Sequence, residues 1–399
     1  MKYSKTIKSI LRGGLLLLAI FCQNLALAQE NNDLPPMDSV EISLLTCQPH
    51  DEVYSLYGHT AIRYHELTRG GIDAAFNYGV FNYDAPFFIL RFVFGLTDYE
   101  LGAYPTPLFQ KEYRHFGSMV TEQVLNLTNE EKLQLRMALV DNLKPANSVY
   151  RYNYFYNNCT TKARDIIERH ISGELKYAGR EDYTPTYREM VHHMTRNHPW
   201  SRFGNDLLLG IQADSKTNMR QQEFLPDNLL YDFDHAQIYS NGQYRPLVKE
   251  RRIAVPAGVQ MIHNGFPLTP RQCGFILLAI GLVLVLIQWR MNKVFVLWEG
   301  LLLLVSGIIG IVLFLMLFSQ HPTVRLNLQI LFFNPIHLAF LWPVLKGRPT
   351  RYWIICAAMG ILFFIGSLFQ SYAEGLWTLA SCLLLQSIPH FLRIRHHEK

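Results

Sequence analysis

The sequence predicts an α+β domain followed by an all-α membrane domain of about five transmembrane helices. Three observations predict this class. Residues 29–270 mix short β-prone runs with stretches of helical spacing. Residues 271–399 are dominated by apolar runs long enough to cross a bilayer. A basic and then apolar N-terminus precedes both regions and is typical of an exported chain.

The first 28 residues have the pattern of a secretory signal peptide. Lysines and an arginine precede an apolar core, which ends in Ala26-Leu27-Ala28 before Gln29. Two small residues around one other residue are the usual cleavage site. We therefore expect residues 29–270 to lie outside the cytoplasm. An uncleaved anchor is the alternative, and it would export the same region.

Two β-prone runs early in the exported region should form a hairpin. "GHTAIRYHEL" alternates in part, and "AAFNYGVFNY" is aromatic and β-like. The pair Gly70-Gly71 between them suits a tight turn. The apolar run "VEISLLTCQ" precedes both and is a further strand candidate.

Two helices are predicted after these runs. "NEEKLQLRMALVDNL" has apolar residues at helical intervals, and Asn126-Leu-Thr128 offers a cap before it. "NCTTKARDIIERHI" is the next helix, and Cys159 lies on its apolar stripe. We expect Cys159 to face the sheet, and Lys162 and Arg164 to be more exposed to solvent.

The membrane region alternates apolar stretches with charged loops. The predicted spans are 273–289, 294–318, 327–345, 352–370 and 373–392. Basic residues gather after the first, third and fifth spans, whereas the other loops hold only Arg325. The positive-inside rule then places the C-terminus in the cytoplasm and residues 29–270 in the periplasm, in an inner-membrane protein. The formal charge of +5 is modest and lies largely in these short loops, so it does not argue for a nucleic-acid partner.

Cys47 and Cys159 are the cysteines clearly available outside the cytoplasm. Oxidising conditions make a disulfide between them one hypothesis. A nucleophile is the other, because a thiol in the first turn of a helix meets free N–H groups and the positive end of the helix dipole. The same N–H groups can stabilise an oxyanion. Asn157 or Asn158 can cap this helix.

A thiolate nucleophile needs a nearby imidazole. His59 is the best candidate, because it starts a predicted strand and its ring can project over the edge of the sheet. For three other histidines a surface or structural role is favoured; these are His65, His192 and His193.

A third polar group should orient the imidazole. Asn77 in "FNYG" is preferred, because it lies beside the space left by Gly79. Asn82 is the alternative, since a tight turn at residues 70–71 would place it roughly opposite His59. The sequence does not fix the strand register, so the choice stays open.

Four segments together resemble the Lnb family of Bacteroidota membrane proteins: "LLTCQPHDEVYSLYGHTAIRY", "FNYGVFNY", "QVLNLT" and "YNYFYNNCTTKARDII". The resemblance covers nearly the whole chain and includes the later "GNDLLLG" and "FLP". It implies a periplasmic domain with a circularly permuted papain-like fold, related to NlpC-type enzymes, followed by a multi-span membrane domain. In the permuted order the histidine strand precedes the cysteine helix, as His59 precedes Cys159 here.

The resemblance also implies an activity, lipoprotein N-acyltransfer. An acyl chain would pass from a phospholipid to Cys159 as a thioester, and then to the α-amine of a diacylated lipoprotein's N-terminal cysteine. His59 would act as base and then as acid, with Asn77, or alternatively Asn82, as the third residue. The backbone N–H of Cys159 would help to hold the oxyanion. No metal or cofactor is expected.

If the substrates are lipids, apolar side chains of the exported region and polar side chains of the membrane region are candidates for binding them. "PFFILRFVFGL" at residues 86–96 could form a lipid-facing surface, and a buried strand or helix is the alternative. The candidate substrate-binding residues are Asn158, His321, Arg325, Asn334 and His337. Helix packing, capping or snorkelling is the alternative for those in the membrane region, and is favoured for Glu299.

Two rival functions stay open. One is an NlpC-like cysteine hydrolase, either a peptidoglycan amidase or peptidase, or a lipase. Five spans argue against a cell-wall enzyme, because such an enzyme needs at most one anchor. The other rival is a non-enzymatic maturation factor for exported proteins, in which Cys159 could be paired with Cys47.

Overall fold

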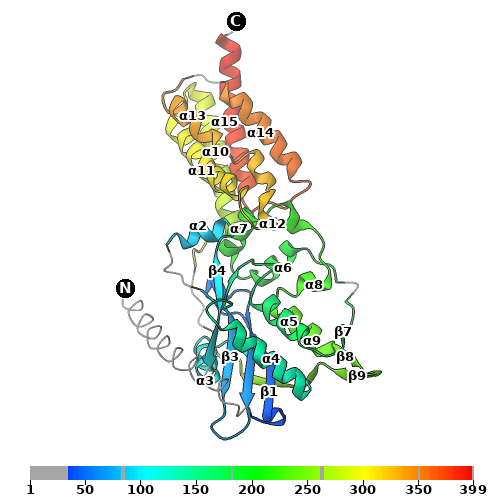
Figure 1. Cartoon of the computed structure of the whole chain (residues 1–399). Coiled ribbons are helices and arrows are strands. Elements are labelled where there is room, and N and C mark those ends of the chain that lie inside the picture. The colour runs from blue at the N-terminus through cyan, green and yellow to red at the C-terminus, as the bar shows by residue number, and fades with distance from the viewer. Residues whose placement is uncertain (1–34, 82–85, 181–182, 261–264, 349–350, 398–399) are drawn as a thin grey trace. The chain divides into compact units, whose positions relative to one another are not determined.

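A computed structural model describes residues 35–81, 86–180, 183–260, 265–348 and 351–397 (Figure 1). The predicted signal peptide lies outside the described residues. The chain forms two compact units. The sheet unit consists of Met1–Phe88, Leu96–Thr184 and Asn218–His263, and the helical unit of Ile89–Gly95, Pro185–Thr217 and Asn264–Lys399. Two stretches before residue 270 therefore belong with the helices.

The sheet unit is built on a seven-stranded antiparallel sheet with the strand order β10-β5-β1-β2-β3-β4-β6. Its strands are β1 (Val40–Cys47), β2 (His59–Glu66), β3 (Asp73–Val80), β4 (Asp98–Pro105), β5 (Val120–Leu125), β6 (Val149–Arg151) and β10 (Val248–Val255). A second sheet contains β7 (Glu174–Lys176), β8 (Gln237–Ser240) and β9 (Gln243–Pro246).

The predicted hairpin is confirmed. Strands β2 and β3 pair antiparallel, with Ile62 opposite Phe76 and His65 opposite Asp73. Gly70 in the connecting turn has a φ of 78°, a left-handed conformation that glycine adopts without steric cost. The run before the hairpin forms β1, whose last residue, Cys47, pairs with His59 at the start of β2.

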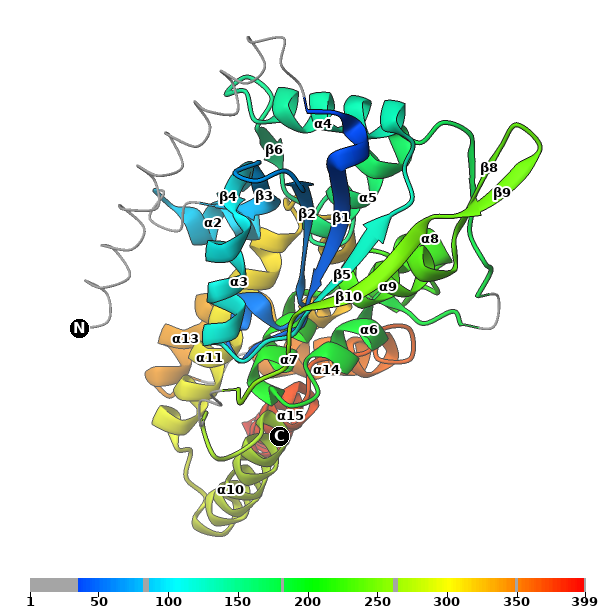
Figure 2. The ribbon, with the colours of Figure 1, turned by 90° about the horizontal axis from the view of Figure 1, so that it is seen from below.

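Helices cover both faces of the large sheet (Figure 2). The helices of the sheet unit are α3 (Thr106–His115), α4 (Asn129–Asn142), α5 (Cys159–Arg169), α8 (Met219–Gln222) and α9 (Pro226–His235). The cap predicted for α4 is confirmed, because the Thr128 hydroxyl accepts from the Glu131 N–H and the Glu131 carboxylate accepts from the Thr128 N–H.

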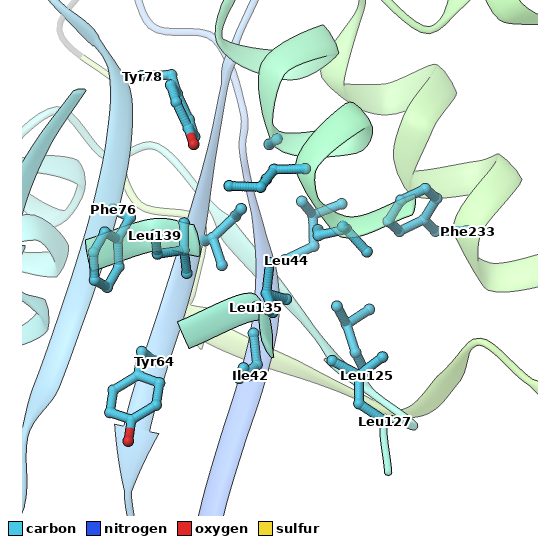
Figure 3. Packing of buried hydrophobic residues seen from close by; sticks show 14 of the residues in the cluster. Ile42, Leu44, Tyr64, Phe76, Tyr78, Leu125, Leu127, Leu135, Leu139 and Phe233 are labelled. Carbon is cyan, nitrogen blue, oxygen red and sulfur yellow. The ribbon is translucent and has the colours of Figure 1, made fainter. Parts of the chain in front are cut away.

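One face of the sheet carries the main hydrophobic core (Figure 3). Ile42, Leu44 and Phe76 project from the strands, and α4, α5 and α9 cover them; Leu139 and Phe233 are fully buried on these helices. The opposite face packs against α3. Because α5 shares the main core with β2 and β3, its start is held close to the beginning of β2.

The helical unit contains the apolar helices of the C-terminal third. Its helices are α2 (Phe88–Val93, whose first residue lies in the sheet unit), α6 (Tyr187–Met194), α7 (Pro199–Leu208), α10 (Pro270–Met291), α11 (Val296–Met316), α12 (Pro322–Arg325), α13 (Ile336–Leu345), α14 (Tyr352–Gly366) and α15 (Leu376–His397). Small residues allow close packing here: a side chain on Gly274 would meet Thr378, and one on Gly310 would meet the backbone of Asn334.

Three stretches within the described residues are long and apolar enough to cross a membrane, namely Pro270–Met291, Val296–Met316 and Pro322–Leu345. The third is not one continuous helix, since α12, the short 3-10 turn Leu328–Leu331 and α13 follow one another within it. Helix α14 is apolar but shorter. The predicted count of five spans is therefore confirmed only for three.

A buried arginine holds the stretch 185–217 together, and Gln329 joins that stretch to the rest of the helical unit. Arg188 is 2% exposed and binds Asp206 at 2.7 Å and Asp214 at 2.8 Å. The side chain of Gln329 donates to the Asp206 carbonyl at 3.0 Å. His192 also contacts Asp206, at 2.8 Å, so it has a structural role, as favoured from the sequence.

Candidate active site

The thiol of Cys159 lies on the first residue of α5 and is half-buried. Asn158 caps the helix, because its side-chain oxygen accepts from the N–H groups of Thr160 at 3.0 Å and Thr161 at 2.9 Å. Its side-chain NH₂ donates to the Phe224 carbonyl at 2.9 Å. Of the two asparagines before the cysteine, Asn158 is therefore the cap, and backbone groups occupy its amide.

His59, the first residue of β2, lies beside a position without a side chain. A Cβ on Gly79 would lie 2.7 Å from Cε1 of His59 and 3.0 Å from Oδ1 of Asn77. The predicted space beside Gly79 is thus real, and the imidazole and the Asn77 amide border it. Asn82, the alternative third residue, lies outside the described residues.

The thiol and the imidazole are coupled by charge. Burial alone would raise the pKa of Cys159, but the positive charge of His59 outweighs it and, with hydrogen bonds from His59, Thr60 and Thr160, lowers the pKa to about 7. Burial alone would lower the pKa of His59, but the Cys159 thiolate and the Asn77 side chain raise it. These opposite shifts favour a thiolate–imidazolium pair near neutral pH.

The His59 ring acts on the Cys159 thiol mainly through its charge and not through a hydrogen bond from Nε2. Nε2 of His59 is buried and, among the described residues, has no hydrogen-bond partner of ordinary geometry. We therefore attribute the lowered thiol pKa mainly to the charge of the ring. Apo sites of this kind often hold long hydrogen bonds that shorten with substrate.

Cys47 is a free thiol and not the partner of Cys159. It is 1% exposed, and burial raises its pKa well above the usual value. The disulfide hypothesis is therefore wrong for this structure. Both cysteines are close to His59, yet only Cys159 has the lowered pKa of a nucleophile.

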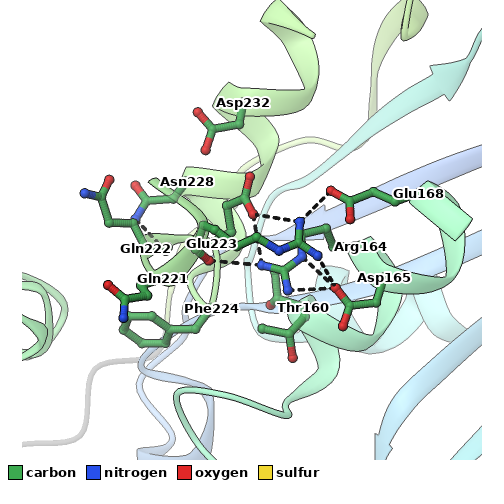
Figure 4. Close-up of polar contacts among 12 residues, drawn as sticks. Thr160, Arg164, Asp165, Glu168, Gln221, Gln222, Glu223, Phe224, Asn228 and Asp232 are labelled. Carbon is green, nitrogen blue, oxygen red and sulfur yellow. Dashed lines mark hydrogen bonds and ion pairs between the residues drawn. The ribbon is translucent and has the colours of Figure 1, made fainter. Parts of the chain in front are cut away.

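The expected exposure of Arg164 is wrong. Its side chain is buried and binds Glu223 at 2.9 Å, Asp165 at 2.7 Å and the Arg220 carbonyl at 3.0 Å (Figure 4). The sequence pattern of α5 shows which residues share a face of this helix, but it does not show which distant residues contact that face. The partner Glu223 lies 59 residues after Arg164. Lys162 is half-buried and lies over the Tyr150 ring at 4.8 Å.

Three aromatic side chains of the sheet unit stack in a row. Tyr99 stacks on Tyr152 at 4.0 Å between ring centroids and on Phe81 at 4.9 Å. Burial raises the pKa values of Tyr99 and Tyr152, and the nearby Cys159 thiolate raises them further, which places both rings within electrostatic reach of the sulfur. We call Phe81, Tyr99 and Tyr152 the aromatic row. Sequence analysis did not identify it, because its three members come from separate segments and only Tyr152 lies in the aromatic run "YRYNYFYNN".

Two family models match the chain. One is described as the Lnb N-terminal periplasmic domain and matches residues 29–193, and the other as the Lnb transmembrane domain and matches residues 262–398. Together they cover about three quarters of the sequence. The chain belongs to the Lnb family. Comparisons with curated proteins and with solved structures each found no match.

Membership of the Lnb family suggests a lipoprotein N-acyltransferase type of function and places the protein in a membrane with a periplasmic N-terminal domain. Cys159, His59 and Asn77 all lie within the part matched by the Lnb periplasmic domain. Within the described residues, no group of histidine, cysteine and acidic side chains is arranged to hold a metal ion.

The other candidate residues lie in the helical unit, within the Lnb transmembrane match. His337 is fully buried, with its ring nitrogens 2.6 Å from the Tyr352 hydroxyl and 2.6 Å from the Phe332 carbonyl. The side chain of Asn334 accepts from the Ile336 N–H at 3.1 Å, at the start of α13. Both side chains have protein partners that account for their polar atoms.

The remaining candidates lie at the two ends of α12, with His321 directly before its first residue and Arg325 as its last residue. Nε2 of His321 is 3.2 Å from the Phe92 carbonyl, and Arg325 is exposed and donates through Nε to the Ser319 carbonyl at 2.7 Å. Glu299 is fully buried and contacts His390 at 2.9 Å, which agrees with the favoured packing role.

Proposed function

We propose that this Lnb-family chain is a membrane-bound acyltransferase that moves an acyl chain from a phospholipid to the N-terminal cysteine of a diacylated lipoprotein. The observation that supports it best is the thiol at the start of α5, whose pKa is lowered to about 7 beside His59. The order of the histidine strand β2 before the cysteine helix α5 agrees with a circularly permuted papain-like fold.

In the first half-reaction, the Cys159 thiolate attacks the ester carbonyl of the phospholipid. A C–S bond forms, and the tetrahedral intermediate collapses with cleavage of the C–O bond. His59, protonated in the ion pair, gives its proton to the departing lysophospholipid oxygen. The products of this step are an acyl-thioester on Cys159 and a neutral imidazole.

In the second half-reaction, the lipoprotein α-amine attacks the thioester carbonyl. The neutral His59 ring takes the proton that the nitrogen loses as the C–N bond forms. Cleavage of the C–S bond releases the amide product and restores the thiolate. The starting thiolate–imidazolium pair is thereby regenerated, and no redox partner is needed.

An oxyanion forms in both half-reactions and requires hydrogen-bond donors. The N–H groups of Thr160 and Thr161 are occupied by Asn158. Among the described residues, no acceptor is found for the N–H of Cys159, which stays available at the positive end of α5. We propose this N–H as one oxyanion donor.

Lipid substrates require apolar surface. Three side chains from the apolar stretch around α2 are exposed, namely Phe87, Leu90 and Leu96. Phe87 is 74% exposed, so most of its ring surface is available to an apolar partner. We propose this stretch as a lipid-facing surface, and the exposed Arg325 as a contact for a phosphate head group.

The proposal is tested in a bacterial strain that needs lipoprotein N-acylation and lacks its own enzyme. The full chain is expressed there, and lipoprotein N-termini are examined by mass spectrometry. We expect an amide-linked acyl chain with the wild-type protein. A free α-amine in the presence of well-expressed protein would contradict the proposal.

Two variants test the roles of the pair. Cys159→Ser and His59→Ala should each abolish N-acylation at unchanged protein level, because the thioester route needs both groups. Retained N-acylation in Cys159→Ser would exclude a thioester. Cys47→Ala is the matched control, since this thiol is buried, and should leave N-acylation intact.

A further inference from the structure

We infer that Thr60 and Thr160 are positioning residues, which hold the Cys159 thiol against the His59 ring through a hydrogen bond between their hydroxyl groups. The consequence for turnover rests on the proposed function. The consequence for the thiol itself does not, because it concerns the ionisation of Cys159 in the absence of any substrate.

The two threonines have equivalent places in the site. Thr60 follows His59 on β2, and Thr160 follows Cys159 on α5. Their Oγ1 atoms are 3.1 Å apart although 100 residues separate them in the sequence. Both side chains are fully buried, so water does not compete for this bond. The bond therefore ties the residue next to the base to the residue next to the nucleophile.

The hydrogen bond also extends toward the sulfur. Oγ1 of Thr160 is 3.8 Å from Sγ of Cys159. A threonine hydroxyl donates one proton and accepts two hydrogen bonds. If Thr60 donates to Thr160, the Thr160 proton points to the thiolate, and the two hydroxyls form one directed chain. This agrees with the lowering of the Cys159 pKa by Thr160 and by the Thr60 N–H.

Other buried threonines in the same sheet lack such pairing. Thr46 on β1 and Thr121 on β5 are fully buried, and their hydroxyls have no hydrogen-bond partner among the described residues. Burial of a threonine hydroxyl in this sheet thus does not by itself produce a pair. The pairing occurs where α5 meets β2 beside the thiol, which is the arrangement expected of a positioning role.

The experiment measures the alkylation rate of Cys159 against pH in the full chain in detergent, read on the Cys159 peptide by mass spectrometry. The wild-type rate should rise through about pH 7. In Thr160→Val we expect the midpoint to move up by about half a pH unit or more, because a donor to the thiolate is lost. Thr160→Ser keeps the hydroxyl and should restore the wild-type midpoint.

A matched control separates positioning from helix capping. The Thr161 hydroxyl contacts only backbone groups of Asn158 in the described hydrogen bonds, so Thr161→Val should weaken the cap but leave the thiol midpoint near 7. Thr60→Val removes the other hydroxyl of the pair. It should lower the N-acylation rate roughly 10-fold, and Thr60→Ser should restore the rate.

The double variant Thr60→Val/Thr160→Val should lose no more activity than the worse single variant, because one shared bond is removed. Additive losses, or a Thr160→Val midpoint that stays near 7, would overturn the inference. If wild-type protein alkylates as expected but never N-acylates lipoproteins, the proposed function fails while the positioning role of the threonines stands.

Discussion

At the scale of single residues, the site depends on a position that has no side chain. Gly79 borders both the His59 ring and the Asn77 amide, and a Cβ there would lie closer to the ring than such atoms ever approach. The ring cannot move aside freely, because its charge interaction with Cys159 defines the ion pair. Gly79 is therefore as much a determinant of the site as the side chains around it.

This predicts that Gly79→Ala displaces the imidazole and lowers N-acylation about 100-fold, since small misplacements of reacting groups are costly. Mass spectrometry of lipoprotein N-termini over time measures the loss. Gly204→Ala is the matched control, because a Cβ there would meet no atom of the described residues within 4 Å, and it should have wild-type activity. Equal rates for the two variants would show that the ring does not need this space.

The sequence was informative about residues whose signals are local. Cys159 at a helix start, His59 at a strand start and the space beside Gly79 were each predicted from their immediate neighbours. The same reasoning was wrong for Arg164, because its acidic partner Glu223 belongs to a distant segment. It also left the Thr60–Thr160 bond unseen, because no short pattern shows which hydroxyls meet across 100 residues.

At the scale of elements, α5 is held by a later segment of the chain. The Phe224 carbonyl accepts from the cap residue Asn158, and Glu223 binds Arg164 nearly two turns further along. Glu223 is fully buried, and burial raises its pKa to about 7 even though Arg164 lowers it. The ionisation of Glu223 is thereby coupled to the stability of α5.

The sign of this coupling gives a prediction. The folded-state pKa of Glu223 is about 7, against about 4.3 for a free glutamate, so the folded state binds the proton more tightly. The stability from this carboxyl is present below about pH 4.3 and is lost as pH rises through 7. Glu223→Gln cannot titrate, so amide hydrogen exchange in α5 should depend less on pH between 5 and 8.

Hydrogen exchange of α5 peptides is the suitable measurement, because a chain with two units has no single unfolding midpoint. The expected difference in the pH dependence is on the order of 2–3 kcal/mol. Glu174→Gln, which changes an exposed carboxylate on β7, is the control and should behave as wild type. Identical pH profiles for all three proteins would contradict the coupling.

At the scale of the whole molecule, the two units are interleaved in the sequence. The stretches 89–95 and 185–217 precede the first apolar helix, yet they group with the helical unit. Hydropathy could predict the long apolar helices, because length and composition define them locally. It could not predict this grouping, which depends on contacts between distant segments, such as those of the Asn327 and Gln329 side chains with the Leu207 carbonyl.

We predict that Arg188→Leu destabilises the helical unit by about 3–5 kcal/mol, because it leaves the buried Asp206 carboxylate and the half-buried Asp214 carboxylate without their cation. Hydrogen exchange should increase in peptides from 185–217 and from the loop around Gln329. The alkylation midpoint of Cys159 should remain near 7, since this thiol belongs to the sheet unit. Arg196→Leu, an exposed arginine that follows α6, is the control. A shifted thiol midpoint with unchanged exchange in 185–217 would refute this assignment.

The interleaving has a consequence for biogenesis. Synthesis proceeds from the N-terminus, so the stretches 89–95 and 185–217 emerge before the helices with which they pack. The Asp206 backbone carbonyl must therefore remain hydrated until Gln329 has been made. Completion of the helical unit is a late event, and a chain released before residue 329 lacks a partner for a segment that it has already synthesised.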